Sequence, residues 1–218
     1  MSVKCQICKR RMAMVHINFL VFVVLTVITC LIGDYVVFTA FQNQMTIIKA
    51  LGDSSIHGLV ALFSWLIIQN EAFLQAIICA AIAMMIDVDH FIQAGSLKIE
   101  DAVRLDQRPF LHSSTLPLCL YIIVMLFNCT VMKNHVIITT YSTLAFVAFF
   151  THHLRDASRR GLWFWPWIQS LPVSYPMYIF LTVFLCLIIR FLLFENIYLS
   201  SNQAKLPMVI QDCRKQLN

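Results

Sequence analysis

Histidines and aspartates gather in four short groups along this sequence, separated by long apolar stretches. The groups are Asp53 with His57; Asp87, Asp89 and His90; His112; and His152, His153 and Asp156. Within three groups an acid and a histidine stand three or four residues apart. On a helix, that spacing places both side chains on one face. The spacing therefore predicts that each pair points to one place beside its helix.

Imidazole nitrogens and carboxylate oxygens are ligands that zinc, manganese and iron accept. A further carboxylate can orient a ligand histidine from behind. A water molecule on such an ion loses much of its proton affinity and can attack an ester or phosphoester at neutral pH. Arg108, Arg159 and Arg160 are close in sequence to two of the groups, and a guanidinium can hold a phosphate or carboxylate. These residues would suit metal-assisted hydrolysis of an anionic substrate.

The elements that must position these groups are apolar helices. The chain has 218 residues, of which 60% are hydrophobic and 12% charged, and its mean hydropathy of +0.77 is outside the range of soluble domains. A spanning helix needs about 20 apolar residues. Six stretches approach that length, at about 12–32, 55–68, 72–91, 113–132, 136–153 and 177–194. Since open sheet edges are not tolerated in lipid, we predict an all-α polytopic bundle of about six transmembrane helices, forming one integral membrane domain over 1–218.

The connections between the six stretches alternate in length. Tight turns at 70–71 and 133–134 alternate with longer connections at 33–53, 93–112 and 155–176. Six consecutive spans then place the three longer connections on one side of the membrane, which we call the loop face. All four histidine and aspartate groups fall at helix ends on this face. The topology therefore predicts that four helices bring them together.

A purely structural explanation competes with a metal site. Polar residues at helix ends normally meet headgroups and water, and Asp53 at a helix start is an ordinary cap. Each of these residues alone is more simply structural. Ionisable groups near membrane depth are costly, however, and here they converge from four helices. We therefore favour a shared metal or polar site.

Four segments carry a resemblance to a known family. They are Asp53–His57 (DSSIH), Ile86–Phe91 (IDVDHF), Arg108–Ser113 (RPFLHS) and Thr151–Trp163 (THHLRDASRRGLW). In this order they resemble the metazoan transmembrane protein 267 family. More remotely, they are similar to the bacterial YdjM-type inner-membrane proteins, which are described as metal-dependent hydrolases. The resemblance covers a family-like core at residues 53–166.

The bacterial pattern has an early histidine, a D-x-D-H, an H-R-G-x-T-H-S and an S-H-x-x-x-D-x-x-T. The resemblance implies metal ligands and catalytic residues at matching positions. The implied ligands are His57, Asp89, His90, His112, His152 and Asp156, and the implied catalytic residues are Arg108 and Asp87. The sequence departs from the pattern at Gln107, Pro109 and Arg159, where the pattern has histidine, glycine and threonine. These departures bear on whether catalysis is retained.

We expect a multi-pass membrane protein with a divalent-metal site, for zinc or manganese, that hydrolyses a lipid or phosphoester. The alternative is a catalytically silent scaffold or adaptor whose polar residues tie helix ends together. A transporter is disfavoured, because ionisable residues would then recur at the middle of the spans. The net charge of +5 comes from small basic groups beside apolar stretches, such as Lys9, Arg10 and Arg11. Such groups suit membrane lipids and not nucleic acid.

Overall fold

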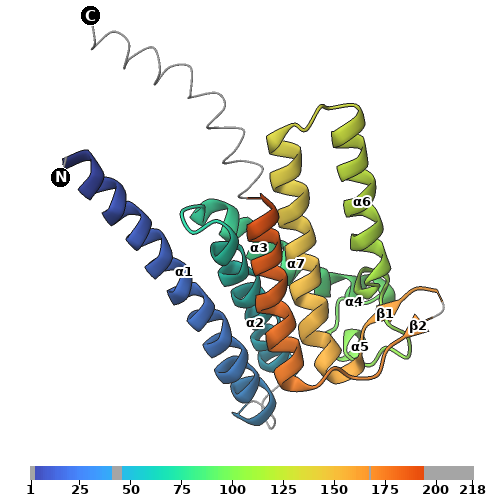
Figure 1. Cartoon of the computed structure of the whole chain (residues 1–218). Helices are drawn as coiled ribbons and strands as arrows, with labels where there is room; N and C mark the ends of the chain where they lie inside the picture. The colour runs from blue at the N-terminus through green and yellow to red at the C-terminus, as the bar shows by residue number, and fades with distance from the viewer. Residues whose placement is uncertain (1–2, 41–45, 167, 194–218) are drawn as a thin grey trace, which may run out of the picture.

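The computed structural model describes residues 3–40, 46–166 and 168–193. Nearly all of its elements are helical (Figure 1). The helices are α1 (Val3–Tyr35), the π-helical turn η1 (Val36–Ala40), α2 (Thr46–Ile68), α3 (Phe73–Met85), the 3-10 turn η2 (Ile86–Val88), α4 (Asp89–Ala94), α5 (Ile99–Ala102), the 3-10 turn η3 (Phe110–His112), α6 (Thr115–Thr130), α7 (Val136–Arg160) and the unlabelled orange helix Tyr175–Leu193. A small antiparallel hairpin of β1 (Trp163–Phe164) and β2 (Ile168–Gln169) follows α7.

Five helices in the described residues are long and apolar enough to cross a membrane. They are Asn18–Tyr35, Thr46–Ile68, Phe73–Ala94, Val136–Arg160 and Tyr175–Leu193. The fourth predicted stretch forms α6, an apolar helix of 16 residues, which is shorter than the about 20 residues that a perpendicular span requires. The prediction of an all-α, multi-pass membrane protein is confirmed.

Helix α2 is the centre of the bundle and packs against α1, α3 and α7. Small side chains allow these helices to approach closely. The buried core combines Ala61 and Trp65 of α2, Ala76, Cys79 and Ala83 of α3, and Leu144, Val147 and Ala148 of α7. A Cβ on Gly58 would lie 2.8 Å from the side chain of Met84. The glycine therefore keeps α2 and α3 close beside His57.

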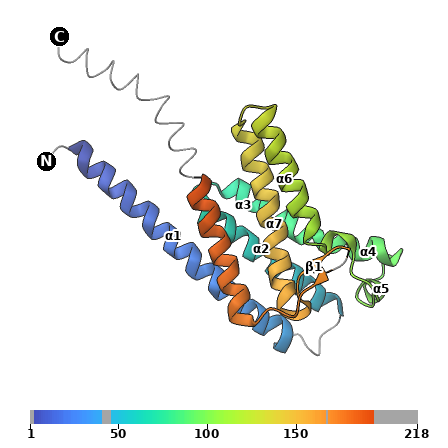
Figure 2. The ribbon, with the colours of Figure 1, turned by 45° about the vertical axis from the view of Figure 1, so that its right-hand side comes forward.

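The short elements α4, α5 and β1 lie together at one end of the bundle, beside the lower end of α6 (Figure 2). The backbone N–H of Ser114 donates to the carbonyl of Trp163 over 2.8 Å, which ties the start of α6 to the hairpin. Arg108 donates to the carbonyls of Arg160 and Gly161 at the end of α7, over 2.5 and 2.9 Å. This end contains the connections 93–112 and 155–176 and is the loop face.

Several helix boundaries differ from the prediction. Helix α2 begins at Thr46 and not at about Ser55, so Asp53 lies inside the helix and is not its cap. The reason is that Asp53 is neutralised within the fold by arginines of α7. Helix α3 ends at Met85, before the predicted end, because the chain tightens into η2. Phe194 and the side chains of Lys9, Arg10, Arg11 and His16 lie outside the described residues.

Candidate metal centre

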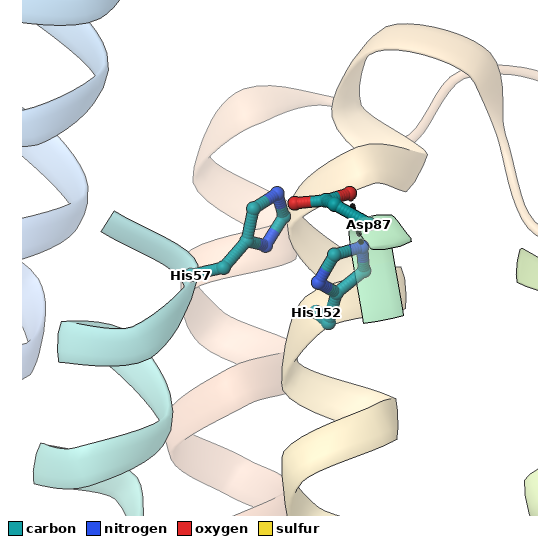
Figure 3. Close-up of side chains that lie close together, drawn as sticks. All are labelled: His57, Asp87 and His152. Carbon is teal, nitrogen blue, oxygen red and sulfur yellow. Dashed lines mark ion pairs between the residues drawn. The ribbon is translucent and has the colours of Figure 1, made fainter. Parts of the chain in front are cut away.

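The loop face brings side chains from four segments to one place. His57 comes from α2, Asp87 from η2, His112 from η3, and His152 and Asp156 from α7. Figure 3 shows the side chains of His57, Asp87 and His152 pointing toward one another from three of these segments. Residues up to about a hundred positions apart in the sequence therefore lie close together here, as the alternation of the connections predicts.

Four donor atoms lie at the middle of this site: Nε2 of His112, Nε2 of His152, Oδ1 of Asp87 and Oδ2 of Asp156. We call these four residues the central quartet. The two nitrogens are 3.2 Å apart. Asp87 Oδ1 lies 3.5 Å from each nitrogen, and Asp156 Oδ2 lies 3.5 Å from His112 and 3.6 Å from His152. An ion with four tetrahedral bonds of about 2.0–2.1 Å needs ligand atoms about 3.3 Å apart. The separation between the two nitrogens, and the separations from each nitrogen to the two carboxylate oxygens, are close to this value.

Local structure explains how each member reaches this point. His152 and Asp156 are one turn apart on α7, so both face the same side. The turn η2 follows α3 and directs Asp87 toward α7. Pro109 is extended, with φ −62° and ψ 154°, and begins the 3-10 turn that carries His112. The proline that departs from the bacterial pattern therefore has a positioning role in this chain.

The ring nitrogens that face away from the centre are held by acceptors. Nδ1 of His152 donates to the carbonyl of Ala83 over 3.0 Å. Nδ1 of His112 lies 3.2 Å from Oδ2 of Asp89, which also accepts the N–H of Leu111 over 2.8 Å. With the proton on Nδ1, the lone pair of each Nε2 faces the centre, which is the arrangement of metal-ligand histidines. Asp89, implied as a ligand by the resemblance, thus stands behind His112.

Two residues act on the outer oxygen of Asp156. Nε2 of His57 lies 3.4 Å from Asp156 Oδ1, and the His57 ring stacks on that of His152 with centroids 3.7 Å apart. Arg159 donates to the same oxygen and, over 3.1 Å, to Oδ2 of Asp53. These contacts fix the Asp156 carboxylate so that its other oxygen faces the centre.

His112 has a strongly shifted titration. Burial lowers the pKa of His112, but the carboxylates of Asp87, Asp89 and Asp156 outweigh burial and raise this pKa to about 9. Without an ion, His112 therefore carries a second ring proton, on Nε2, at neutral pH. A divalent cation bound by the central quartet would replace that proton and balance the surrounding carboxylates.

A chain of ion pairs extends from the site to α1, and a hydrogen bond continues it to the helix Tyr175–Leu193. Arg155 is only 1% exposed and lies 2.7 Å from Asp34 of α1 and 2.7 Å from Asp53 of α2. The hydroxyl of Tyr178 donates to the other oxygen of Asp34 over 2.5 Å. The sequence prediction missed Asp34, Arg155 and Tyr178 as parts of this site. An acid directly after the first apolar stretch was the available signal, because acids near membrane depth are costly.

A cavity of about 220 Å³ reaches the centre from the loop face. Its lining includes Asp87, His90, His112, Asp156 and three arginines, whereas His57 and His152 do not line it. The side chain of Asp87 is 32% exposed and that of His152 is fully buried. The site therefore has a closed end at His57 and His152 and an open end at Asp87 and His90.

The predicted site residues take three positions: some lie in groups that could hold an ion, one lies behind the histidines, and one lies at the cavity. Three overlapping groups have donor atoms within 4.8 Å of one another: His57, Asp87 and His152; Asp87, His90 and His112; and His112, His152 and Asp156. Among the described residues, Asp89 belongs to none of these groups and orients histidines. Arg108 lies at the cavity, where it holds the end of α7.

Comparison with known proteins finds relatives of one kind. The chain is 32% identical to transmembrane protein 267 of Danio rerio over 172 residues, which cover 75% of this chain and 76% of that protein. It is 31% identical to transmembrane protein 267 of Xenopus laevis over 158 residues, covering 70% and 73% of the two chains. The protein of Bos taurus is 29% identical over 157 residues, covering 70% and 73%. No family model and no solved structure matches the chain.

Proposed function

The chain belongs to the transmembrane protein 267 family, and from this premise we propose that this multi-pass membrane protein binds a divalent metal ion on its loop face. The observation that carries the proposal is the spacing of the central quartet: the two imidazole nitrogens lie 3.2 Å apart, and each carboxylate oxygen lies 3.5–3.6 Å from both of them. Two imidazoles and two carboxylates neutralise a divalent cation and suit zinc first and manganese next.

We further propose that the site is hydrolase-like, in keeping with the more remote resemblance to the YdjM-type proteins. A divalent ion in the quartet would polarise an ester or phosphoryl oxygen and lower the pKa of water. Asp87, His112 and Asp156 line the cavity, and Asp87 is the most exposed member of the quartet, so reactants would arrive on its side. Hydrolysis of a phosphoester joins a water oxygen to phosphorus, breaks the bond to the alcohol oxygen and passes one water proton to that oxygen.

The arginines at the cavity favour an anionic substrate. Arg108, Arg159 and Arg160 all line it. Both terminal nitrogens of Arg108 donate to backbone carbonyls, and each carries a second hydrogen that an anion could accept. The position of the cavity at the membrane face suits a phosphoester whose alcohol part is a lipid. Arg108 would then hold the anion and the end of α7 together.

A silent scaffold is the second candidate, and one observation favours it. The buried pairs among Asp34, Arg155 and Asp53 join α1, α2 and α7 without any ion. The hydrolase-like proposal adds a dependence on metal that a scaffold lacks.

The test uses the full chain in detergent with mixed micelles of lipid phosphomonoesters, phosphodiesters or carboxylic esters. We expect hydrolysis of a phosphoester that stops with a chelator, returns with zinc or manganese, and is lost in His152→Ala. The matched control is His135→Ala, whose side chain is exposed outside the four groups. Hydrolysis that does not depend on metal would contradict the hydrolase-like proposal. So would a metal-loaded protein that hydrolyses none of the three ester classes, and that result would favour the scaffold.

A further inference from the structure

His90 is arranged as a metal ligand but lies outside the central quartet. Its Nδ1 is 3.1 Å from Oδ1 of Asp89, just as Nδ1 of His112 is held by the other oxygen of the same carboxylate. One carboxylate therefore orients two histidines in the same way. An Nδ1–H that donates to Asp89 leaves the lone pair of His90 on Nε2. A ring oriented in this way has Nε2 available to bind a metal ion.

Asp87 and His112 have possible ligand atoms close to His90. These three residues offer donor atoms within 4.8 Å of one another, which is slightly more than two metal–ligand bonds of about 2.1 Å. Asp87 Oδ1 belongs to the quartet, and a carboxylate has a second oxygen that can bind another cation. Asp87 and His90 are also the side chains at the open end of the site, 32% and 24% exposed.

Charge distinguishes this position from the other candidate, beside His57. There, Nε2 of His57 is engaged with Asp156, and the guanidinium of Arg159 occupies the same carboxylate oxygen. The positive charge of Arg159 therefore already lies where a metal ion would bind beside His57. On the His90 side, the near neighbours are the carboxylates of Asp87 and Asp89.

We propose that Asp87 and His90 hold a second divalent ion on the cavity side of the quartet, with Asp87 bridging the two ions. This inference rests on the proposed metal site of the central quartet and deepens it. Only two protein groups hold the second ion, so its remaining positions are open to water and to substrate oxygens from the cavity. Pairs of ions about 3.5–4 Å apart are typical of phosphoryl-group hydrolysis. A pair of ions therefore favours a phosphoester as the substrate class.

The test counts manganese ions bound to the detergent-purified full chain by equilibrium dialysis against Mn²⁺ alone. We expect two ions per wild-type chain, one in His90→Ala and two in His135→Ala. Electron paramagnetic resonance supplies a second readout. Wild-type protein should give an exchange-coupled spectrum, and His90→Ala and His90→Gln should give the spectrum of an isolated ion. His90 lies at the open end of the site, so both variants keep the buried contacts of the fold.

The outcomes separate the two proposals. One uncoupled ion in the wild-type chain would overturn the second site and leave the quartet standing. Two coupled ions that persist in both His90 variants would overturn the location of the second site. No bound ion in the wild-type chain would overturn the quartet and the second site together.

Discussion

Replacing Asp89 with asparagine should weaken metal binding, although Asp89 is no member of the central quartet. One Asp89 oxygen accepts both the Leu111 N–H, over 2.8 Å, and Nδ1 of His112, while the other meets Nδ1 of His90. An asparagine offers one acceptor in place of two. Either histidine that loses its acceptor can move its proton to Nε2, which then repels the ion.

The expected loss follows from this geometry. Removing the group that orients a ligand histidine typically costs 10- to 100-fold in metal affinity, or about 1.4–2.7 kcal/mol. Asp89 is 7% exposed, so solvent cannot easily replace its contacts, and the upper part of this range is expected. A removed ligand would cost more than this.

The assay is a competition titration of detergent-purified protein with zinc and a fluorescent chelator. Asp106→Asn is the matched control, since Asp106 is an exposed aspartate of the connection 93–112, and the affinity of this variant should stay within about twofold of wild type. Equal affinities for Asp89→Asn and Asp106→Asn would refute the orienting role. A loss confined to thermal stability, with unchanged affinity, would refute it equally.

Three further predictions follow from the charges of the site. Because the metal-free His112 has a pKa of about 9, a metal ion must displace its second ring proton. The apparent metal affinity, titrated at several pH values, should therefore rise about tenfold per pH unit from pH 6 and level off above about pH 9. An affinity independent of pH would contradict this. Arg155→Met takes the arginine partner from buried Asp34 and leaves Asp53 with Arg159 alone, and should lower the free energy of unfolding by about 3–5 kcal/mol, measured by denaturant unfolding in detergent. Tyr178→Phe removes the hydroxyl from buried Asp34 and should cost less, about 1–3 kcal/mol; a cost above that of Arg155→Met would reverse the order that we expect.

The sequence was informative where simple periodicities apply. The hydrophobic thickness of a bilayer requires long apolar helices, so the spans could be recognised from runs of apolar residues. The helical repeat places His152 and Asp156 on one face, and the structure brings their donor atoms to 3.6 Å. Alternating connections then sufficed to place the four groups on one side. These inferences needed no knowledge of individual contacts.

Roles within the site depended on features that such periodicities do not contain. Asp87 and Asp89 occur in one D-x-D-H segment, yet the turn η2 directs Asp87 to the centre and leaves Asp89 behind His112. The start of α2 was missed because Asp53 and Lys49 interrupt the apolar run. Asp53 stays inside the helix because Arg155, 102 residues later, pairs with it. Local sequence cannot reveal a partner at that separation.

The most direct test of the central claim is the metal content of the full chain purified in detergent, measured by elemental analysis. The quartet predicts at least one zinc or manganese ion per wild-type chain and an unchanged content in His135→Ala. His152→Ala and Asp156→Asn should each lose the ion of the quartet. A wild-type chain without stoichiometric metal, or a content that neither variant lowers, would contradict the claim.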